Sequence, residues 1–205
     1  MKKRMLTAIV CASLMSSPLF AAEEKRISES LEMTQGQNLE IDFPVGSIEI
    51  IIVEGNELTI DIAIEGKDEG WFSQGHDVSN VTLEKRIKEN RVSLEISEDN
   101  LNQEWTIKVP KFAAIDIELG VGSVNVEKLT NSLEVDVGVG SIKIDTTLND
   151  FKSVELSSGV GDTSMKGFEN VKSTRNVVSS ELNYTGSGEY SIEAEVGVGD
   201  IKIRR

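Results

Sequence analysis

Apolar and polar residues alternate along most of the chain, as expected for strands that bury one face. In residues 133–144, LEVDVGVGSIKI, the alternation runs to Val139 and then resumes one position out of phase at Ile142. Because strand side chains alternate faces with a period of two, such a slip would turn the second half over unless the backbone bends. Gly138 and Gly140 flank Val139, and glycine tolerates a bend. The stretch therefore predicts a strand, a Gly-x-Gly corner and a second strand.

The same pattern recurs at residues 39–50, 115–126, 154–165 and 192–203, and a degenerate copy without glycines lies near Ser180. The glycines that precede the slips, Gly122, Gly140, Gly161 and Gly199, are spaced by 18, 21 and 38 residues. The predicted structural corners are Gly46, Gly120, Gly122, Gly138, Gly140, Gly159, Gly161, Gly197 and Gly199.

A repeat of about 19 residues is typical of stacked β-repeats, so the sequence predicts an all-β fold, a β-solenoid (β-helix) of about 19-residue turns. In that arrangement one inward column would contain Val45, Val121, Val139, Val160, Ser179 and Val198. We therefore expect Val139→Asp to destabilise the fold severely, because it would bury an unpaired charge. An antiparallel sandwich of hairpins would explain the alternation but not the recurrent slip.

The chain order suggests a leader followed by one continuous domain. Residues 1–22 have the features of a signal peptide: Lys2, Lys3 and Arg4, an apolar stretch, and small residues at Ala21 and Ala22. Residues 23–111 are expected to form an N-terminal β region with the first repeat and inserted antiparallel strands, and residues 112–205 the remaining repeats. We expect export, with the periplasm favoured over the cell surface or secretion.

Charge and cysteine content narrow the possible functions. The 35 acidic and 21 basic residues give a formal charge of −14, and loss of the leader would make the chain more acidic. This balance disfavours nucleic acid and anionic lipid headgroups as partners. Cys11, the only cysteine, lies in the predicted leader, so a mature chain would have no disulfide and no cysteine chemistry.

Residues 105–129, WTIKVPKFAAIDIELGVGSVNVEKL, combine two alternating strands around Val-Pro-Lys with a Gly-Val-Gly-Ser corner. This order resembles the bacterial putative-adhesin family, uncharacterised exported or envelope-associated β-repeat proteins. The resemblance extends from about Leu39 to Ile203. It implies a right-handed single-stranded β-solenoid-like fold with no known active site. The chain would then combine this fold with an antiparallel β elaboration at its N-terminal end.

No catalytic, cofactor-binding or metal-binding residue is predicted. His76 is the only histidine, and zinc sites normally need more nitrogen or sulfur ligands. Trp71 and Phe72 are a possible contact with a protein or glycan, or they could cover the end of the core. The outward residues Asp116, Glu118, Glu134, Asp136 and Glu155 would form acidic rows, either a solvated face or an acid and base for glycan chemistry.

These observations favour a non-enzymatic, exported protein of the cell envelope with an adhesin-like, scaffold or binding role. The alternative is a carbohydrate-active enzyme or glycan-binding protein that uses the acidic face. We expect no cofactor, no nucleic acid and no membrane span, and a partner that is an envelope protein or glycan of unknown identity.

Overall fold

The computed structural model describes residues 24–67 and 77–205. This part of the chain forms thirteen strands and no helix, so it contains no helix that could cross a membrane. The strands are β1 (Glu24–Glu32), β2 (Asn38–Val53), β3 (Glu57–Gly66), β4 (Glu84–Lys88), β5 (Arg91–Glu95), β6 (Leu101–Pro110), β7 (Ile115–Leu129), β8 (Leu133–Thr146), β9 (Ser153–Val160), β10 (Thr163–Lys166), β11 (Lys172–Arg175), β12 (Ser180–Thr185) and β13 (Ser191–Arg204).

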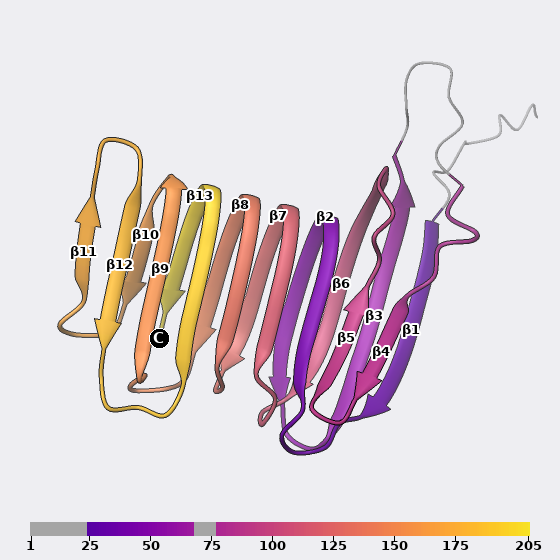
Figure 1. Cartoon of the computed structure of the whole chain (residues 1–205), viewed down its shortest axis with the longest axis horizontal. Helices are drawn as coiled ribbons and strands as arrows, with labels where there is room; N and C mark the ends of the chain where they lie inside the picture. The colour runs from indigo at the N-terminus through magenta and orange to yellow at the C-terminus, as the bar shows by residue number, and fades with distance from the viewer. Residues whose placement is uncertain (1–23, 68–76) are drawn as a thin grey trace, which may run out of the picture.

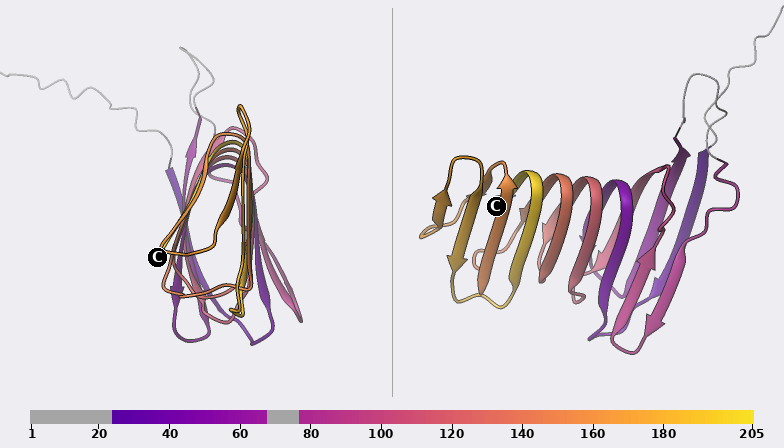
Figure 2. Two further views of the ribbon diagram at one scale, coloured as in Figure 1. Left: turned by 90° about the vertical axis from the view of Figure 1, so that its left-hand side faces the viewer. Right: turned by 45° about the horizontal axis from the view of Figure 1, so that its top comes forward.

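Four long strands, β2, β7, β8 and β13, bend over in the middle and stand side by side (Figure 1). We call the part before each bend the first arm and the part after it the second arm. Neighbouring long strands are parallel and in register on both sides of the bend; Val121 of β7, for example, pairs with Val139 of β8. Each bend therefore carries one strand through two layers that face each other across the core, as the end-on view shows (Figure 2).

The shorter strands extend each layer at its ends. The layer of the first arms has the order β4-β5-β2-β7-β8-β13-β9-β12-β11. The layer of the second arms has the order β1-β3-β6-β2-β7-β8-β13-β10. Pairing is parallel from β5 or β6 through to β9 or β10, and antiparallel at the outer strands.

The structure corrects the predicted fold: the chain is all-β, but it is not a right-handed single-stranded solenoid. A solenoid stacks its turns in sequence order, whereas β13, the last strand, lies between β8 and β9. In addition, β12 runs antiparallel to β9, so the stretch near Ser180 is not a degenerate parallel copy. The result is one mixed sheet of 13 strands, folded over at its bends.

The predicted inward column of valines is also wrong. Val121, Val139, Val160 and Val198 lie at the bends and are between 47% and 49% exposed. The last inward residue of the first arm of β8 is Val137, which is fully buried, and the next is Ile142. The chain needs the four intervening residues to cross from one layer to the other, so the middle of this segment points outward. Severe destabilisation by Val139→Asp is therefore no longer expected.

Close packing of the backbone at the bends explains why glycine recurs there. Gly140 has φ +156° and is paired with Gly122 of the neighbouring strand. A Cβ atom added to Gly140 would lie 1.7 Å from the carbonyl oxygen of Gly122, far inside any van der Waals contact. The same contact repeats between Gly122 and Gly46 at 1.6 Å. A side chain at these positions would force adjacent strands apart.

The core between the layers consists mainly of Ile, Val and Leu, with larger side chains towards β2 and β6. There the rings of Phe43 and Trp105 stack, with their centroids 5.2 Å apart. The indole nitrogen of Trp105 donates a hydrogen bond of 3.0 Å to Oε1 of the buried Gln103. The Nε2 atom of Gln103 donates to the Ile96 carbonyl at 3.3 Å, so both polar atoms of this side chain have partners. Burial of the apolar faces of both layers is the main source of stability.

Insertion of β13 makes two connections cross near the lower end of the sheet, β8–β9 and β12–β13, and Asp150 joins them. Its carboxylate accepts hydrogen bonds from the Tyr184 hydroxyl at 2.5 Å and from the backbone nitrogen and hydroxyl of Ser187, both at 2.8 Å. These bonds lower the pKa of Asp150 from 3.8 to about 2, because they favour the ionised form. The backbone bond from Lys152 N to Tyr190 O, at 2.8 Å, adds to the junction.

Candidate functional surfaces

The outer side of the first arms carries two rows of carboxylates, one residue from each strand. Because the strands are in register and alternate in burial, residues at equivalent positions all point away from the core. Adjacent members of a row are separated by about one strand spacing, roughly 4.8 Å. The first row is Glu40, Asp116, Glu134, Glu193 and Glu155, and the second is Asp42, Glu118, Asp136 and Glu195. These nine residues are called the acidic face below.

Repulsion between neighbouring carboxylates contributes to raised pKa values at two residues of the acidic face, Glu134 and Asp116. The pKa of Glu134 is raised, first by the charge of Asp116 and then by burial, Glu193 and Asp136. The pKa of Asp116 is raised by burial and by Glu40. Glu40 differs because its pKa is lowered, chiefly by a hydrogen bond of 2.7 Å from the Ser93 hydroxyl.

A shallow depression of about 270 Å³ lies at one end of the acidic face, between Glu40, Asp116, Glu134 and Glu193. The described part of the chain contains no group of three His, Cys, Asp or Glu side chains arranged to hold a metal ion. The negative charge of the two rows favours cationic groups on this face. The raised pKa values of Asp116 and Glu134 favour the protonated form of these two residues.

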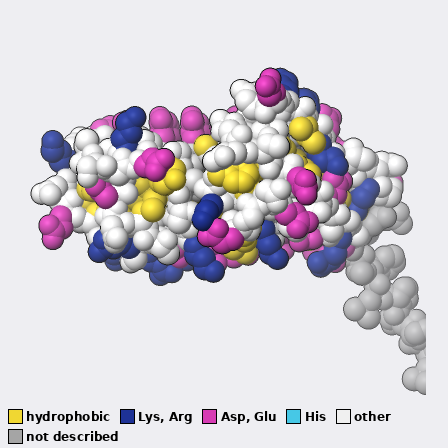
Figure 3. Space-filling model, turned by 90° about the horizontal axis from the view of Figure 1, so that it is seen from below, with side chains coloured by type: hydrophobic (Ala, Val, Ile, Leu, Met, Phe, Trp, Pro, Cys, Tyr) yellow, Lys and Arg dark blue, Asp and Glu magenta, His cyan; other side chains and the backbone are white. Residues whose placement is uncertain are grey.

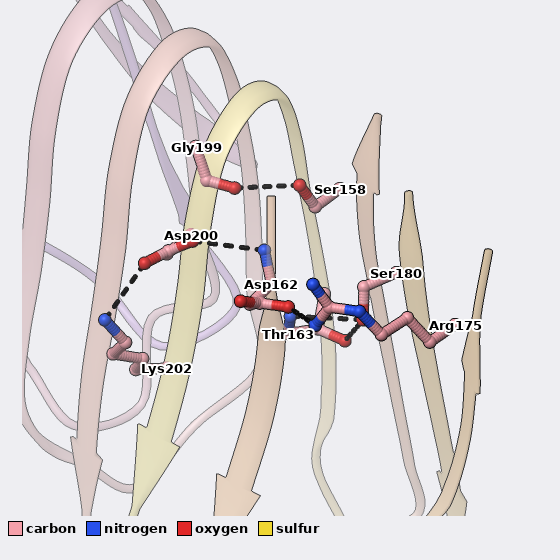
Figure 4. Close-up of polar contacts among 8 residues, drawn as sticks. All are labelled: Ser158, Asp162, Thr163, Arg175, Ser180, Gly199, Asp200 and Lys202. Atoms are coloured by element: carbon pink, nitrogen blue, oxygen red, sulfur yellow. Dashed lines mark hydrogen bonds and ion pairs between the residues drawn. The ribbon is translucent and has the colours of Figure 1, made fainter. Parts of the chain in front are cut away.

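Polar contacts close the far end of the row of bends, where the strand breaks between β9 and β10 (Figure 4). The buried Ser158 hydroxyl donates to the Gly199 carbonyl at 2.8 Å, and the backbone nitrogen of Asp162 donates to Asp200 Oδ1 at 3.1 Å. The hydroxyls of Thr163 and Ser180 lie 2.8 Å apart. These hydroxyls bond to backbone groups and to each other, and the bonds link β9, β10, β12 and β13 at this end.

A second hollow, of about 640 Å³, lies at the end of the sheet opposite the bends. Figure 3 looks onto this end and shows apolar side chains in several patches, with Lys and Arg side chains along one edge and Asp and Glu side chains between the patches. We call this hollow of about 640 Å³ the loop-end hollow. It is lined by Ile52, Val53, Glu54, Lys111, Phe112, Lys128, Thr130, Thr147, Leu148 and Tyr190.

Several predicted residues fall outside the part of the chain that the structure describes. They are the leader with Cys11, and Trp71, Phe72 and His76. The nine corner glycines lie at the bends of β2, β7, β8 and β13 and where β9 ends. The carboxylates predicted to point outward do so. Sequence reasoning missed the loop-end hollow, whose walls come from connections that share no repeat pattern.

Sequence comparison identifies the family. The family model described as the N-terminal domain of toast_rack, DUF2154, matches residues 20–166, more than half of the chain. The chain belongs to this family. Its parallel bent strands, set side by side, fit the name. The match ends at the last residue of β10, so β13 lies outside the matched segment in sequence but between two of its strands, β8 and β9, in space.

A solved structure from Clostridium resembles the toast-rack chain in fold. A "putative cell adhesion protein" from Clostridium sporogenes ATCC 15579 aligns with a TM-score of 0.50 and 17% identity, over 89% of this chain and 99% of the other. A "putative adhesin" from Bacteroides fragilis NCTC 9343 aligns with a TM-score of 0.39 and 16% identity, over 87% and 97%. No curated protein matches. The resemblance to putative adhesins is supported in part, because the Clostridium protein is described as a putative cell adhesion protein.

Proposed function

We propose that the toast-rack chain is an exported, non-enzymatic, adhesin-like protein of the cell envelope, and that its acidic face contacts the partner. The neighbour described as a cell adhesion protein and the leader-like N-terminal residues support this role. Adhesion needs a rigid surface and no reaction, and the two layers held in register supply such a surface.

The observation that carries the proposal is the acidic face itself. Its nine carboxylates are held in rows by backbone register, and neighbouring negative charge contributes to the raised pKa values of Glu134 and Asp116. Features that oppose stability are commonly retained for function. Charge complementarity then favours a partner with cationic groups, which would relieve the repulsion on binding.

A binding assay with matched variants tests this role. Labelled protein would be titrated onto envelope preparations from the source bacterium. The first variant carries Glu118→Gln, Asp136→Asn and Glu195→Gln on the acidic face. The control carries Glu57→Gln, Asp61→Asn and Glu65→Gln on β3, in the other layer, with the same change in net charge.

We expect the acidic-face variant to lose about tenfold in affinity, equivalent to about 1.4 kcal/mol, and the control to bind like the wild type. Binding by the wild type should weaken with salt. Equal loss of affinity in both variants would show that binding depends on net charge and not on the acidic face, which would contradict the proposal. Unchanged binding by the acidic-face variant would also refute it.

A carbohydrate-active enzyme is the second candidate, because Glu134, whose pKa is raised, lies between the carboxylates of Asp116 and Glu193 in the first row, and glycoside hydrolysis uses a general acid paired with a second carboxylate. The test is hydrolysis of envelope glycans by the wild type and by Glu134→Gln. Release of reducing ends by the wild type that the variant abolishes would favour catalysis over adhesion.

A further inference from the structure

The loop-end hollow has the size and walls of a small-molecule site. Its volume of about 640 Å³ falls within the range of roughly 300–1,000 Å³ that ligand pockets occupy. Phe112, Leu148 and Tyr190 line it, and each is only partly buried against the core. The lining residues come from β2, β7 and five separate connections, so the hollow is formed only when the whole lower end is assembled.

An irregularity in β7 places a charged side chain in the hollow. Pairing of β7 with β8 is regular as far as Val126 and shifts before Leu129, which indicates a bulge between them. Within this bulge Lys128 has φ +58°, a left-handed conformation that is uncommon for lysine. Bulges redirect side chains and are frequent next to functional sites, as are residues in such conformations. Here the bulge makes Lys128 part of the lining.

The charge of Lys128 is not compensated within the described part of the chain. The one acidic residue of the lining, Glu54, already pairs with Lys111 at 2.7 Å. Lys128 forms no ion pair with any residue in 24–67 or 77–205. The hollow thus combines apolar and aromatic walls with one free ammonium group, in a protein whose formal charge is −14.

We propose that the loop-end hollow binds a small carboxylate with an apolar body, of the size of a medium-chain fatty acid. The apolar part would lie against Phe112, Leu148 and Tyr190, and the carboxylate would pair with Lys128. A cationic ligand would meet the free ammonium group, and a neutral apolar ligand would leave it unpaired. This site is separate from the acidic face, so either proposal can fail without the other.

Amide NMR titration of the chain with three ten-carbon probes tests the site. The probes are decanoate, decanol and decyltrimethylammonium, each below its micelle concentration. We expect decanoate to shift the resonances of Phe112, Lys128, Leu148 and Tyr190 with saturation, decanol to bind about tenfold more weakly, and the cation to leave these resonances in place. Decanoate shifts scattered over other surfaces, or equal affinity for decanol, would overturn the proposal.

Two lysine substitutions separate the proposed role from general charge. Lys128→Met keeps the aliphatic part of the side chain and removes the charge. Lys172→Met makes the same change on β11, at an exposed residue far from the lining. We expect Lys128→Met to lower decanoate affinity about tenfold without changing decanol affinity, and Lys172→Met to change neither. Unchanged decanoate affinity in Lys128→Met would refute the assigned role.

Discussion

Gly140→Ala is the sharpest test of how the rack is held together. Gly140 combines two features that oppose any side chain: φ of +156° and a neighbour whose carbonyl oxygen would lie 1.7 Å from the new Cβ. That oxygen belongs to the backbone of Gly122, so it can move only if β7 moves. The methyl group therefore cannot be accommodated by rotating a side chain.

The expected loss can be worked out from these two terms. A non-glycine residue in this backbone region costs about 1–3 kcal/mol, and forcing extra volume into a packed interior costs about 1–3 kcal/mol. The smaller entropy of the unfolded alanine chain returns about 0.4–1 kcal/mol. The net loss is about 1–6 kcal/mol, which lowers Tm by roughly 2–24 °C in a protein of this size.

Denaturation in urea and by heating measures this loss, and two other glycines separate its causes. Gly55 has φ +104° with no atom within 4 Å of an added Cβ, so Gly55→Ala reports backbone strain alone. Gly138 is free of that strain, but an added Cβ would lie 2.6 Å from the carbonyl oxygen of Gly120, so Gly138→Ala reports the steric term. The reasoning is refuted if Gly140→Ala destabilises no more than Gly55→Ala.

Four further outcomes follow from burial and charge. Val139→Asp should cost less than about 1 kcal/mol in urea denaturation, whereas Val137→Asp, which buries a charge, should cost more than about 3 kcal/mol. Thr130→Val should stabilise the chain by about 1 kcal/mol, because the buried Oγ1 of Thr130 has no partner within the described residues. Asp150 is held ionised with a pKa of about 2, so its contribution is complete above pH 3.8 and disappears as the pH falls towards 2; a stability–pH profile of Asp150→Asn should lack this decline. Glu134 has a raised pKa, so its ionisation opposes folding as the pH rises past its ordinary range; Glu134→Gln should raise Tm at pH 7 and make no difference at pH 3.

The strands and their alternation could be predicted because the signal is local. The slip between Val139 and Ile142 located a bend, and the outward position of Asp136 followed from the period of two. The side that Val139 faces could not be derived in the same way. A phase slip shows that the chain turns between two regular segments, but it does not show which intervening residue points away from the core.

The order of the strands could not be predicted, because every repeat copy can pair with every other. Residues 133–144 and 192–203 align without a gap, and β13 pairs in register with β8 on one side and β9 on the other. The spacing of the repeat copies along the sequence therefore does not determine which strands are neighbours in the sheet. The connections differ from copy to copy, and Asp150 in one of them bonds to Tyr184 and Ser187, which lie 34 and 37 positions further along the chain.

The repeat accounts for the parallel bent strands and the acidic face, and departures from the repeat account for the loop-end hollow. The acidic face follows directly from the repeat. Equivalent outward positions of the parallel strands lie side by side, so carboxylates at one position of the repeat form a row. The loop-end hollow depends on what the repeat lacks: a bulge at Lys128, and connections of unequal length that carry Phe112, Leu148 and Tyr190. Substitutions within the repeat should therefore act mainly on stability or on the charge of a whole face. Discrimination between small ligands should depend on the irregular end, where one side chain can change without disturbing a neighbouring strand.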